Sequence, residues 1–361
     1  MRFPFAYDQI LERVRKIDPI KYGQTRNFGD GAITYLSPYI SRGVINTKQV
    51  LESVLSAGHN PHSIEKFIQE LAWRDYWQQC WISKGDLIDE DLRQKQPRAE
   101  RRGMPLSISN HQTGIETIDR GIEDFYKDGY LHNHLRMYIA SLACNIGRCH
   151  WKIPAQWMYY NLLDADWGSN ALSWQWVCGA NSNKMYFANQ ENINKYFYSN
   201  QRNSFLDIRY DVIDKIGIPE KLLSLESPVL KAKLPDTDIP IINPELPTMI
   251  YNFYNLDPEW RRETKANKIM LLEPSVFEKY PVSSKSLDFC MTLAKQNIPE
   301  IQIWVSEFSH LKSVVNGKIY FKEHPLNNYE GYNDERDWLS SVKGDYPSFF
   351  AFWKKVKKEL F

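Results

Sequence analysis

The stretch LLDADWGSNALSWQW, from Leu162 to Trp176, contains two aspartates, an asparagine and three tryptophans within fifteen residues. Carboxylates, amides and indoles are costly to bury together unless each polar group has a hydrogen-bond partner. The stretch therefore indicates a site whose polar and aromatic side chains meet a partner outside the stretch itself.

The composition narrows the class of protein. A net charge of +1 produces no global basic field, so a nucleic-acid site has to be a local patch. The five cysteines are scattered along the chain, which favours a cytoplasmic protein without a disulfide framework and predicts no metal site. No run approaches the ~20 apolar residues of a membrane span. Eight of the twelve tryptophans lie between Trp73 and Trp176, so the first half of the chain is where indoles are needed.

The first 220 residues are predicted to be helical, because apolar residues recur at spacings of three and four. Thr113 and Glu116 have the spacing of a capping box, and Asp128-Gly129 predicts the end of that helix. The expected helices span residues 6–16, 47–57, 63–81, 113–128, 132–147 and 154–163.

A proline-rich stretch, residues 221–247, is the expected linker between a helical domain at 1–220 and a small α/β domain at 248–361. Beyond it, KIMLLEP, IQIWVSE and GKIYFKEH are typical of buried strands, and residues 283–297 are typical of a crossover helix. Such an order predicts a parallel sheet. The basic amphipathic tail YPSFFAFWKKVKKELF is expected to pack on this sheet rather than on a membrane.

Four segments of the helical half are expected to converge on one ligand. The hydroxyls and N–H groups before Pro38 form a seat for phosphate at a helix start, and Glu70, Trp73 and Arg74 share a broad helix face. A capped helix start and an intrahelical ion pair explain these two segments equally well when each is taken alone. Together with HNHLRM and the opening stretch, they indicate a large aromatic ligand that carries phosphates. No P-loop, G-x-G-x-x-G or Ser-His-Asp order accompanies them.

In this order and spacing, LSPY, ELAWRDYW, TGIETIDRGI, HNHLRM, DADWGSN and WQW resemble motifs of the FAD-binding helical domain of the DNA photolyase and cryptochrome family. The resemblance extends from about Tyr22 to Phe197. It implies an all-α fold that binds FAD. In repair members of the family, light-excited reduced flavin donates an electron to a UV-induced pyrimidine dimer, and the split product returns it.

The resemblance implies which residues of this chain bind FAD. Asp164 would pair with Arg136, Asn170 would face flavin N5, and Arg74 would meet a phosphate. An amide near N5 can respond to protonation without adding a charge, so it suits a reduced flavin. The implied FAD-binding residues are Tyr22, Thr34, Tyr35, Leu36, Ser37, Phe67, Arg74, Asn133, Arg136, Asp164, Ala165, Asp166 and Asn170.

The resemblance also implies residues for DNA and for the reaction. A flipped dimer needs aromatic walls and a carboxylate, and Glu70 matches the position of that carboxylate. Trp174 and Trp151 match the inner members of an electron path to the flavin. The implied lesion and DNA contacts are Arg26, Glu70, Trp73, His134, Met137 and Trp176, and the implied catalytic residues are Glu70, Asn170, Trp174 and Trp151.

The sequence departs from the family pattern at several positions. No α/β antenna domain precedes the helical half in this sequence, and the strand pattern after residue 247 suggests a rearranged order. Ile115 stands at the outer position of the tryptophan chain. His134 stands where many dimer-repair members have arginine, and Ile33 and Tyr35 replace a frequent threonine and arginine of the phosphate loop.

Three functions fit the sequence. A light-driven DNA repair lyase would use the lesion residues as well as FAD, on DNA that contains UV lesions. A cryptochrome-like blue-light receptor would need only the flavin residues and a surface for a partner. A helical protein whose tryptophan-rich core is merely packing is the third. The C-terminal domain is expected to have a structural role or to bind a protein partner, rather than to hold an antenna chromophore.

Overall fold

Segments far apart in the sequence assemble into two units in the computed structural model, which describes residues 2–361. Unit 1 consists of residues 2–23, 34–83 and 231–361, and unit 2 consists of residues 24–33 and 84–230. This grouping cuts across the boundaries expected from the sequence, because residues after 247 pack against helices from the first part of the chain. Those boundaries stay a prediction.

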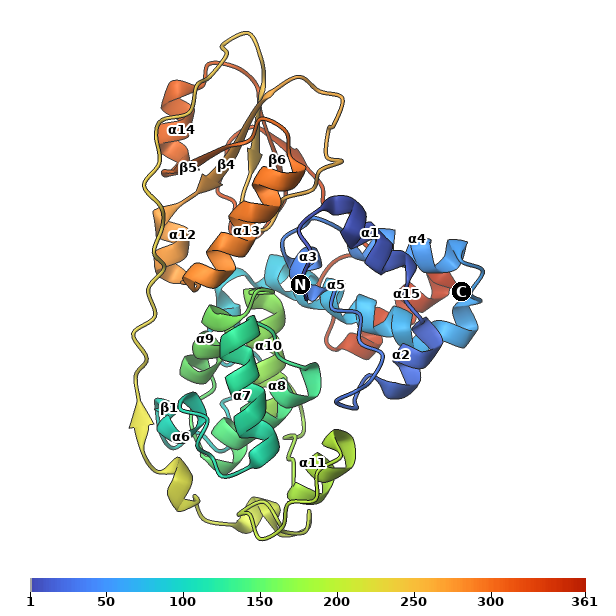
Figure 1. Ribbon diagram of the computed structural model, residues 1–361, viewed down its shortest axis with the longest axis vertical. Coiled ribbons are helices and arrows are strands. Elements are labelled where there is room, and N and C mark those ends of the chain that lie inside the picture. The colour runs from blue at the N-terminus through green and yellow to red at the C-terminus, as the bar shows by residue number, and fades with distance from the viewer. Residues whose placement is uncertain (1) are drawn as a thin grey trace. The chain divides into compact units, whose positions relative to one another are not determined.

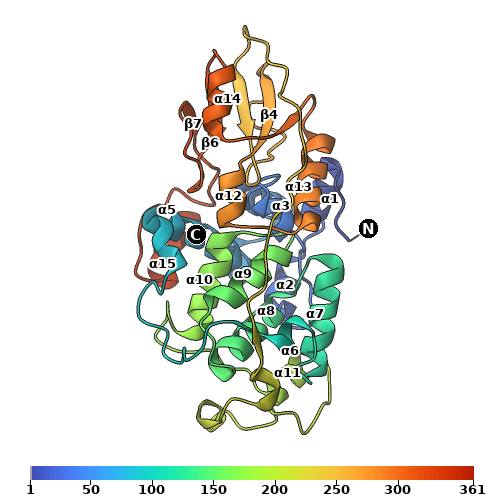
Figure 2. The same cartoon turned by 90° about the vertical axis from the view of Figure 1, so that its left-hand side faces the viewer.

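Unit 2 is mainly helical. α10 (Trp167–Cys178) lies beside α8 (Asn133–Ala140) and α9 (Lys152–Asn161), and α7 (Glu116–Asp128) lies beside α8 (Figures 1 and 2). α8 continues into a π-helical segment, Ser141–Ile146, so the expected helix at 132–147 is present with a change of winding. The remaining elements are α6 (Leu106–Ser109), α11 (Gln190–Phe197), the short antiparallel pair β1 (Met104–Pro105) and β2 (Leu225–Glu226), and 3₁₀ turns at Gly85–Asp89, Ile213–Lys215 and Glu220–Leu222.

The expected capping box at the start of α7 is wrong. The carboxylate of Asp119 accepts hydrogen bonds from Thr113 N at 2.8 Å, Thr113 Oγ1 at 2.7 Å and Gly114 N at 2.9 Å. Asp119, and not Glu116, therefore fixes the turn before α7. Hydrogen bonds to its charged carboxylate are stronger than the bonds to the Thr113 hydroxyl that a capping box would use. The predicted end of α7 is confirmed, because Gly129 adopts the left-handed conformation with φ 67°.

Unit 1 contains a parallel sheet of five strands in the order β5-β4-β3-β6-β7. The parallel sheet is confirmed, and this order is that of a doubly wound α/β fold. Three strands were expected. β3 was missed although its four residues, TMIY, are all buried, because it directly follows the proline-rich stretch, and β7, with the residues YND, lacks an apolar pattern. The elements of this part are β3 (Thr248–Tyr251), β4 (Asn267–Leu272), α12 (Pro274–Lys279), α13 (Ser284–Asn297), β5 (Gln302–Val305), α14 (Phe308–Val314), β6 (Ile319–Lys322) and β7 (Tyr332–Asp334).

The core beside the sheet forms where α14 covers strands β3 to β6 (Figure 1). Ile250, Ile269 and Trp304 from the strands pack with Leu311 of α14 in one buried apolar cluster. The stretch before β3 has no helix or strand after β2, but it is bound to the edge strand β5. Ile241 and the amide of Gln302 exchange two hydrogen bonds, of 2.8 and 2.9 Å. In the same stretch, Thr237 Oγ1 accepts from Val305 N at 2.9 Å, which satisfies a backbone group of the sheet edge.

The other part of unit 1 consists of helices from the two ends of the chain. They are α1 (Tyr7–Arg15), α2 (Pro19–Thr25), α3 (Ser37–Ser41), α4 (Thr47–Ser56), α5 (Glu65–Lys84), with a 3₁₀ turn at Pro61–Ile64, and α15 (Phe349–Leu360). The expectation that the C-terminal helix packs on the sheet is wrong. α15 lies along α5, where Phe352 contacts Tyr76 and Lys357 forms an ion pair with Glu65 (Figure 1).

Asp75 of α5 ties the segment before α15 to this helix. Its buried carboxylate accepts hydrogen bonds from Thr47 Oγ1 at 2.9 Å and from Leu339 N at 2.7 Å. Burial raises the pKa of Asp75 to about 6, although both hydrogen bonds favour the ionised form. One of the contacts that hold the C-terminal segment on α5 therefore involves a titratable group.

Candidate functional site

The opening stretch of the sequence builds the start of α10 in unit 2. Asp166 caps the helix by accepting a hydrogen bond from Ser169 N at 2.7 Å. Asn170 lies one turn further, buried, and its Nδ2 donates to the carbonyl of Ala155 at 2.8 Å. Because a carbonyl only accepts, the amide nitrogen has to face Ala155, and the amide oxygen is left as an acceptor.

Asp164 and Arg136 form the ion pair that the sequence predicted. Arg136 Nη2 lies 3.0 Å from each oxygen of Asp164, and Arg136 Nε donates to the carbonyl of Leu131 at 2.9 Å. The carboxylate is almost fully buried, whereas the arginine is partly exposed. This pair therefore joins the start of α8 to the turn before α10 and fixes the direction of both side chains.

His134, one of the predicted DNA contacts, is buried in unit 2. Its Nδ1 contacts the carbonyl of Asn27 at 2.9 Å and its Nε2 contacts the hydroxyl of Tyr186 at 3.2 Å. Since the carbonyl only accepts, Nδ1 carries the proton, and Nε2 accepts from the hydroxyl. Burial lowers the pKa of His134, so the ring is neutral at pH 7. The ring therefore adds no positive charge at this position at pH 7.

Four other predicted DNA and flavin residues of unit 2 are more accessible than His134. Trp176 is 37% exposed and lies beside the ring of Tyr186, with 6.4 Å between ring centroids. Asn133, the first residue of α8, is exposed, and Arg26 and Met137 are half-buried. Unit 2 therefore presents an indole and a thioether to solvent, while His134 is withdrawn.

The two tryptophans of the predicted electron path are both buried in unit 2. Trp151 donates its indole N–H to Asp91 at 2.8 Å, and its ring centroid lies 6.3 Å from that of Trp167. Trp167 in turn contacts Tyr159 edge-on, with 5.5 Å between centroids. The sequence analysis did not identify Trp167 and Tyr159 as neighbours of the predicted electron path. It considered only the outer family position, which Ile115 occupies.

In unit 1, the predicted phosphate seat lies just before α3. Tyr35 has φ 55°, an unfavourable conformation for a bulky side chain, and Thr34 Oγ1 accepts from Leu36 N at 3.4 Å. Backbone strain of this kind is common at ligand sites. The guanidinium of Arg74 donates to the hydroxyl of Ser41, a residue that sequence reasoning missed. Ser37 begins α3, one residue before the proline that was expected to open it.

Two further residues of the predicted FAD set meet in unit 1. Tyr22 contacts Phe67 edge-on, with 5.2 Å between ring centroids and 89° between ring planes. Phe67 is buried and Tyr22 is half-buried. The contact brings residues from α2 and α5 together, as a shared ligand would require.

Glu70 and Trp73 lie one turn apart on α5, each with a partner. Glu70 forms an ion pair with Lys66 at 3.0 Å. The indole of Trp73 stacks on the ring of Phe349, with 3.6 Å between centroids and 9° between planes, and Trp77 lies 5.0 Å away at 40°. One face of the indole is therefore covered by α15, a contact that no local sequence signal predicts.

The covering helix is firmly held. Burying a large apolar side chain stabilises a fold by about 1.5–3 kcal/mol. α15 buries four such side chains, so displacing it costs on the order of 5 kcal/mol or more. The stacking of a base recovers only about 1–3 kcal/mol. α15 is therefore a fixed wall beside Trp73. The four buried residues are Phe349, Phe352, Trp353 and Val356.

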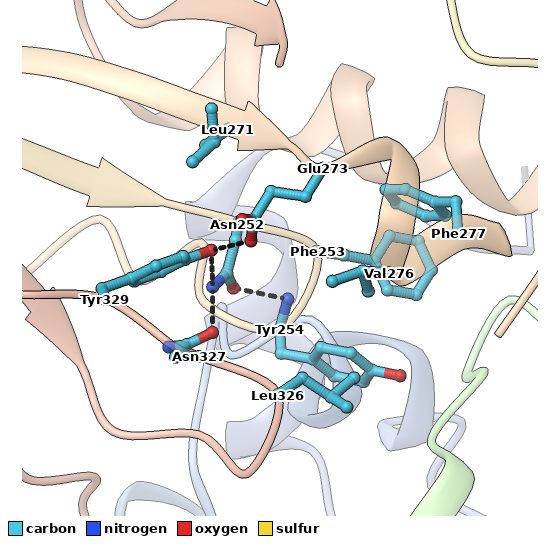
Figure 3. Close-up of a pocket in the computed structure, with 10 residues that line it drawn as sticks. All are labelled: Asn252, Phe253, Tyr254, Leu271, Glu273, Val276, Phe277, Leu326, Asn327 and Tyr329. Carbon is cyan, nitrogen blue, oxygen red and sulfur yellow. Dashed lines mark hydrogen bonds between the residues drawn. The ribbon is translucent and has the colours of Figure 1, made fainter. Parts of the chain in front are cut away.

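A small cavity of about 20 Å³ lies at the carboxyl ends of β3, β4 and β6 (Figure 3). Tyr329 donates its hydroxyl to Glu273 at 2.7 Å, and Asn252 donates to Asn327 at 2.9 Å. Burial raises the pKa of Glu273. Ligands of doubly wound sheets bind at this end, but a cavity of this size holds little more than one water molecule. The polar groups around it are bonded to one another.

Within residues 2–361, no group of three His, Cys, Asp or Glu side chains is placed to hold a metal ion. Over this range, too, none of the helices combines the length and apolar character that crossing a membrane requires.

Comparison with known proteins gives consistent results. Residues 67–205 match the model of the FAD binding domain of DNA photolyase. The chain is 28% identical over 156 residues to a deoxyribodipyrimidine photo-lyase of Alkalihalophilus pseudofirmus, which covers 42% of this chain and 33% of that protein. It is 22% identical over 192 residues to cryptochrome-1 of Arabidopsis thaliana, which covers 48% of this chain and 27% of that protein.

The fold is shared with a solved structure as well. A cryptochrome from Synechocystis matches with a TM-score of 0.50 at 22% identity, over 54% of this chain and 44% of that chain. The chain spans about a third of the length of the curated relatives it matches. The range matched by the family model, residues 67–205, contains the predicted FAD residues from Phe67 to Asn170, and Tyr22 and residues 34–37 lie before it.

Proposed function

We propose that this protein is a light-driven DNA repair flavoprotein that binds FAD, because residues 67–205 match the model of the FAD binding domain of DNA photolyase. Its substrate would be DNA with a UV-induced pyrimidine dimer. Excited reduced FAD supplies the electron that splits the dimer. The residues of this chain would bind the flavin, hold the lesion and exclude water.

The orientation of Asn170 carries this proposal. Its nitrogen is fixed on Ala155, so the amide oxygen is the group that can accept a hydrogen bond from a ligand. Flavin N5 bears a proton in the reduced state and none in the oxidised state. An acceptor that carries no charge therefore suits reduced FAD, the form that repair requires.

Other features fit FAD. The strained backbone at Tyr35 and the hydroxyls beside it suit a phosphate seat, with Arg74 as the cation. The Arg136–Asp164 pair fixes the direction of a buried carboxylate, a group of the type that accepts hydrogen bonds from a flavin ring edge. We propose that the other predicted residues also contact FAD. They are Tyr22, Leu36, Phe67, Asn133, Ala165 and Asp166.

Glu70 and Trp73 support repair over signalling. A carboxylate one turn from an indole provides a proton donor or acceptor beside an aromatic wall, which a flipped pyrimidine dimer needs. The alternative function, a cryptochrome-like blue-light receptor, requires neither residue. The similarity to cryptochrome-1 keeps this alternative open.

A repair assay tests the proposal. The purified protein, chemically reduced and supplied with a thymine-dimer oligonucleotide, should restore intact thymines under blue light and not in the dark. A protein that binds FAD and responds to light, yet leaves dimers intact in both single and double strands, would favour the receptor. A colourless protein that takes up no FAD on reconstitution would contradict both functions.

A further inference from the structure

The outer face of α15 is strongly basic. Its twelve residues include four lysines and one glutamate, in a chain whose net charge is only +1. Lys354, Lys355 and Lys358 are exposed, whereas Lys357 is paired with Glu65 at 2.6 Å. The single carboxylate, Glu359, accepts from the backbone N and the hydroxyl of Ser341. The exposed lysines therefore form a local positive patch.

This patch is attached to the proposed lesion site within unit 1. α15 begins with the ring that stacks on Trp73, and the next residue, Phe350, is 68% exposed. Phe350, Lys354 and Lys358 are spaced by four, so they form one stripe along the helix surface. Because the opposite face of α15 is buried in the protein, the stripe keeps a fixed position relative to Trp73.

We infer that α15 extends the DNA-binding surface of this protein, with Lys354, Lys355 and Lys358 neutralising backbone phosphates of the strand that carries the lesion. This inference rests on the proposed repair function. Phosphate contacts position a protein on DNA without reading the sequence, as a lesion-specific enzyme needs.

The chemistry of α15 favours DNA over a membrane. A helix that binds a bilayer needs an apolar face free to enter it, in addition to its lysines. The apolar face of α15 is buried against α5, and Phe350 is the one large apolar side chain that the helix exposes. The lysines and a single exposed ring match a strand of phosphates and bases better.

Salt dependence tests the inference. The variant K354Q/K355Q/K358Q removes three charges, and K233Q/K265Q/K295Q is a matched control with three exposed lysines elsewhere in unit 1. Binding of a dimer-containing single strand is measured between about 50 and 200 mM salt. Each lost phosphate contact reduces the slope of log K against log salt by about 0.7, so the first variant should lose about 2. The control should keep the wild-type slope, and both proteins should keep their FAD.

The outcomes separate the inference from the function on which it rests. If wild type binds and repairs the dimer but the α15 variant keeps its slope, the inference is wrong and the repair function stands. If wild type does not bind damaged DNA, the repair function fails. Lysine-dependent binding to vesicles with phosphatidylserine, without an effect on DNA, would assign α15 to membranes. Tighter lesion binding by K357Q, which releases Glu65, would show that α15 covers the site instead of extending it.

Discussion

One guanidinium nitrogen of Arg136 lies 3.0 Å from both carboxylate oxygens of Asp164. The two residues come from different segments of the opening motifs, HNHLRM and DADWGSN, and the pair joins them. Because only the arginine is partly exposed, the pair is asymmetric: the buried carboxylate depends on its partner more than the arginine does.

Asp164→Ala should destabilise the protein and release FAD. The change leaves Arg136 without its carboxylate in a mostly buried position, which costs about 3 kcal/mol. Urea unfolding of the flavin-free protein and the FAD absorbance after purification measure the two effects. Glu100→Ala is the control, since it breaks the more exposed pair with Arg148 and should cost less than about 1 kcal/mol. Equal effects of the two changes would contradict the role of Asp164.

Replacing tryptophans of the electron path should slow photoreduction of oxidised FAD. Trp174→Phe and Trp151→Phe each insert a ring that is much harder to oxidise. Because the ring of Trp167 lies next to that of Trp151, with 6.3 Å between centroids and 32° between planes, Trp167→Phe should slow the reaction as well. Trp157→Phe, a buried tryptophan that bonds to Tyr126, is the control. The rate is followed by absorbance under blue light, and repair by chemically reduced protein should not change. Wild-type photoreduction in all three path variants would exclude this route.

Glu70→Gln should lower repair far more than it lowers FAD content. The substitution keeps the shape of the side chain but removes its charge and its capacity to transfer a proton. Lys66→Gln breaks the same ion pair and leaves Glu70 intact, so it separates the carboxylate from the pair. An exposed pair of this kind is worth at most about 1 kcal/mol, so both proteins should fold. Equal repair yields in the two variants would argue against a role for Glu70.

Asp75 should make stability depend on pH. Its pKa is about 6 in the folded protein against 3.8 ordinarily, because burial disfavours the charge. The folded state thus binds this proton more tightly than the unfolded chain does. Protonation of Asp75 therefore adds to the free energy of unfolding. This added stability is present in full below about pH 4 and is lost as the pH rises through 6, a change of about 3 kcal/mol. The difference in unfolding free energy between wild type and Asp75→Asn, measured from pH 4 to 7, should show this loss. Parallel pH curves would contradict it.

The sequence by itself determined the local structure and the type of ligand. The caps of α10 and α13, at Asp166 and Ser283, lie within three residues of the N–H groups they bind. Hydrophobic period and caps act over a few residues, so a pattern read along the chain contains them. The motifs were specific enough to indicate FAD, and the pairing of Arg136 with Asp164 followed from the same motifs.

Only the tertiary structure decided which distant segments meet. Leu339 N donates to Asp75 across 264 residues, and the ring of Phe349 covers that of Trp73. The local sequence around these residues predicts neither contact. His134 has the sequence position of a DNA contact, yet its environment makes it neutral and buried. Such contacts depend on how whole elements pack, because burial and pairing are set by the three-dimensional neighbours of a side chain and not by its neighbours in sequence.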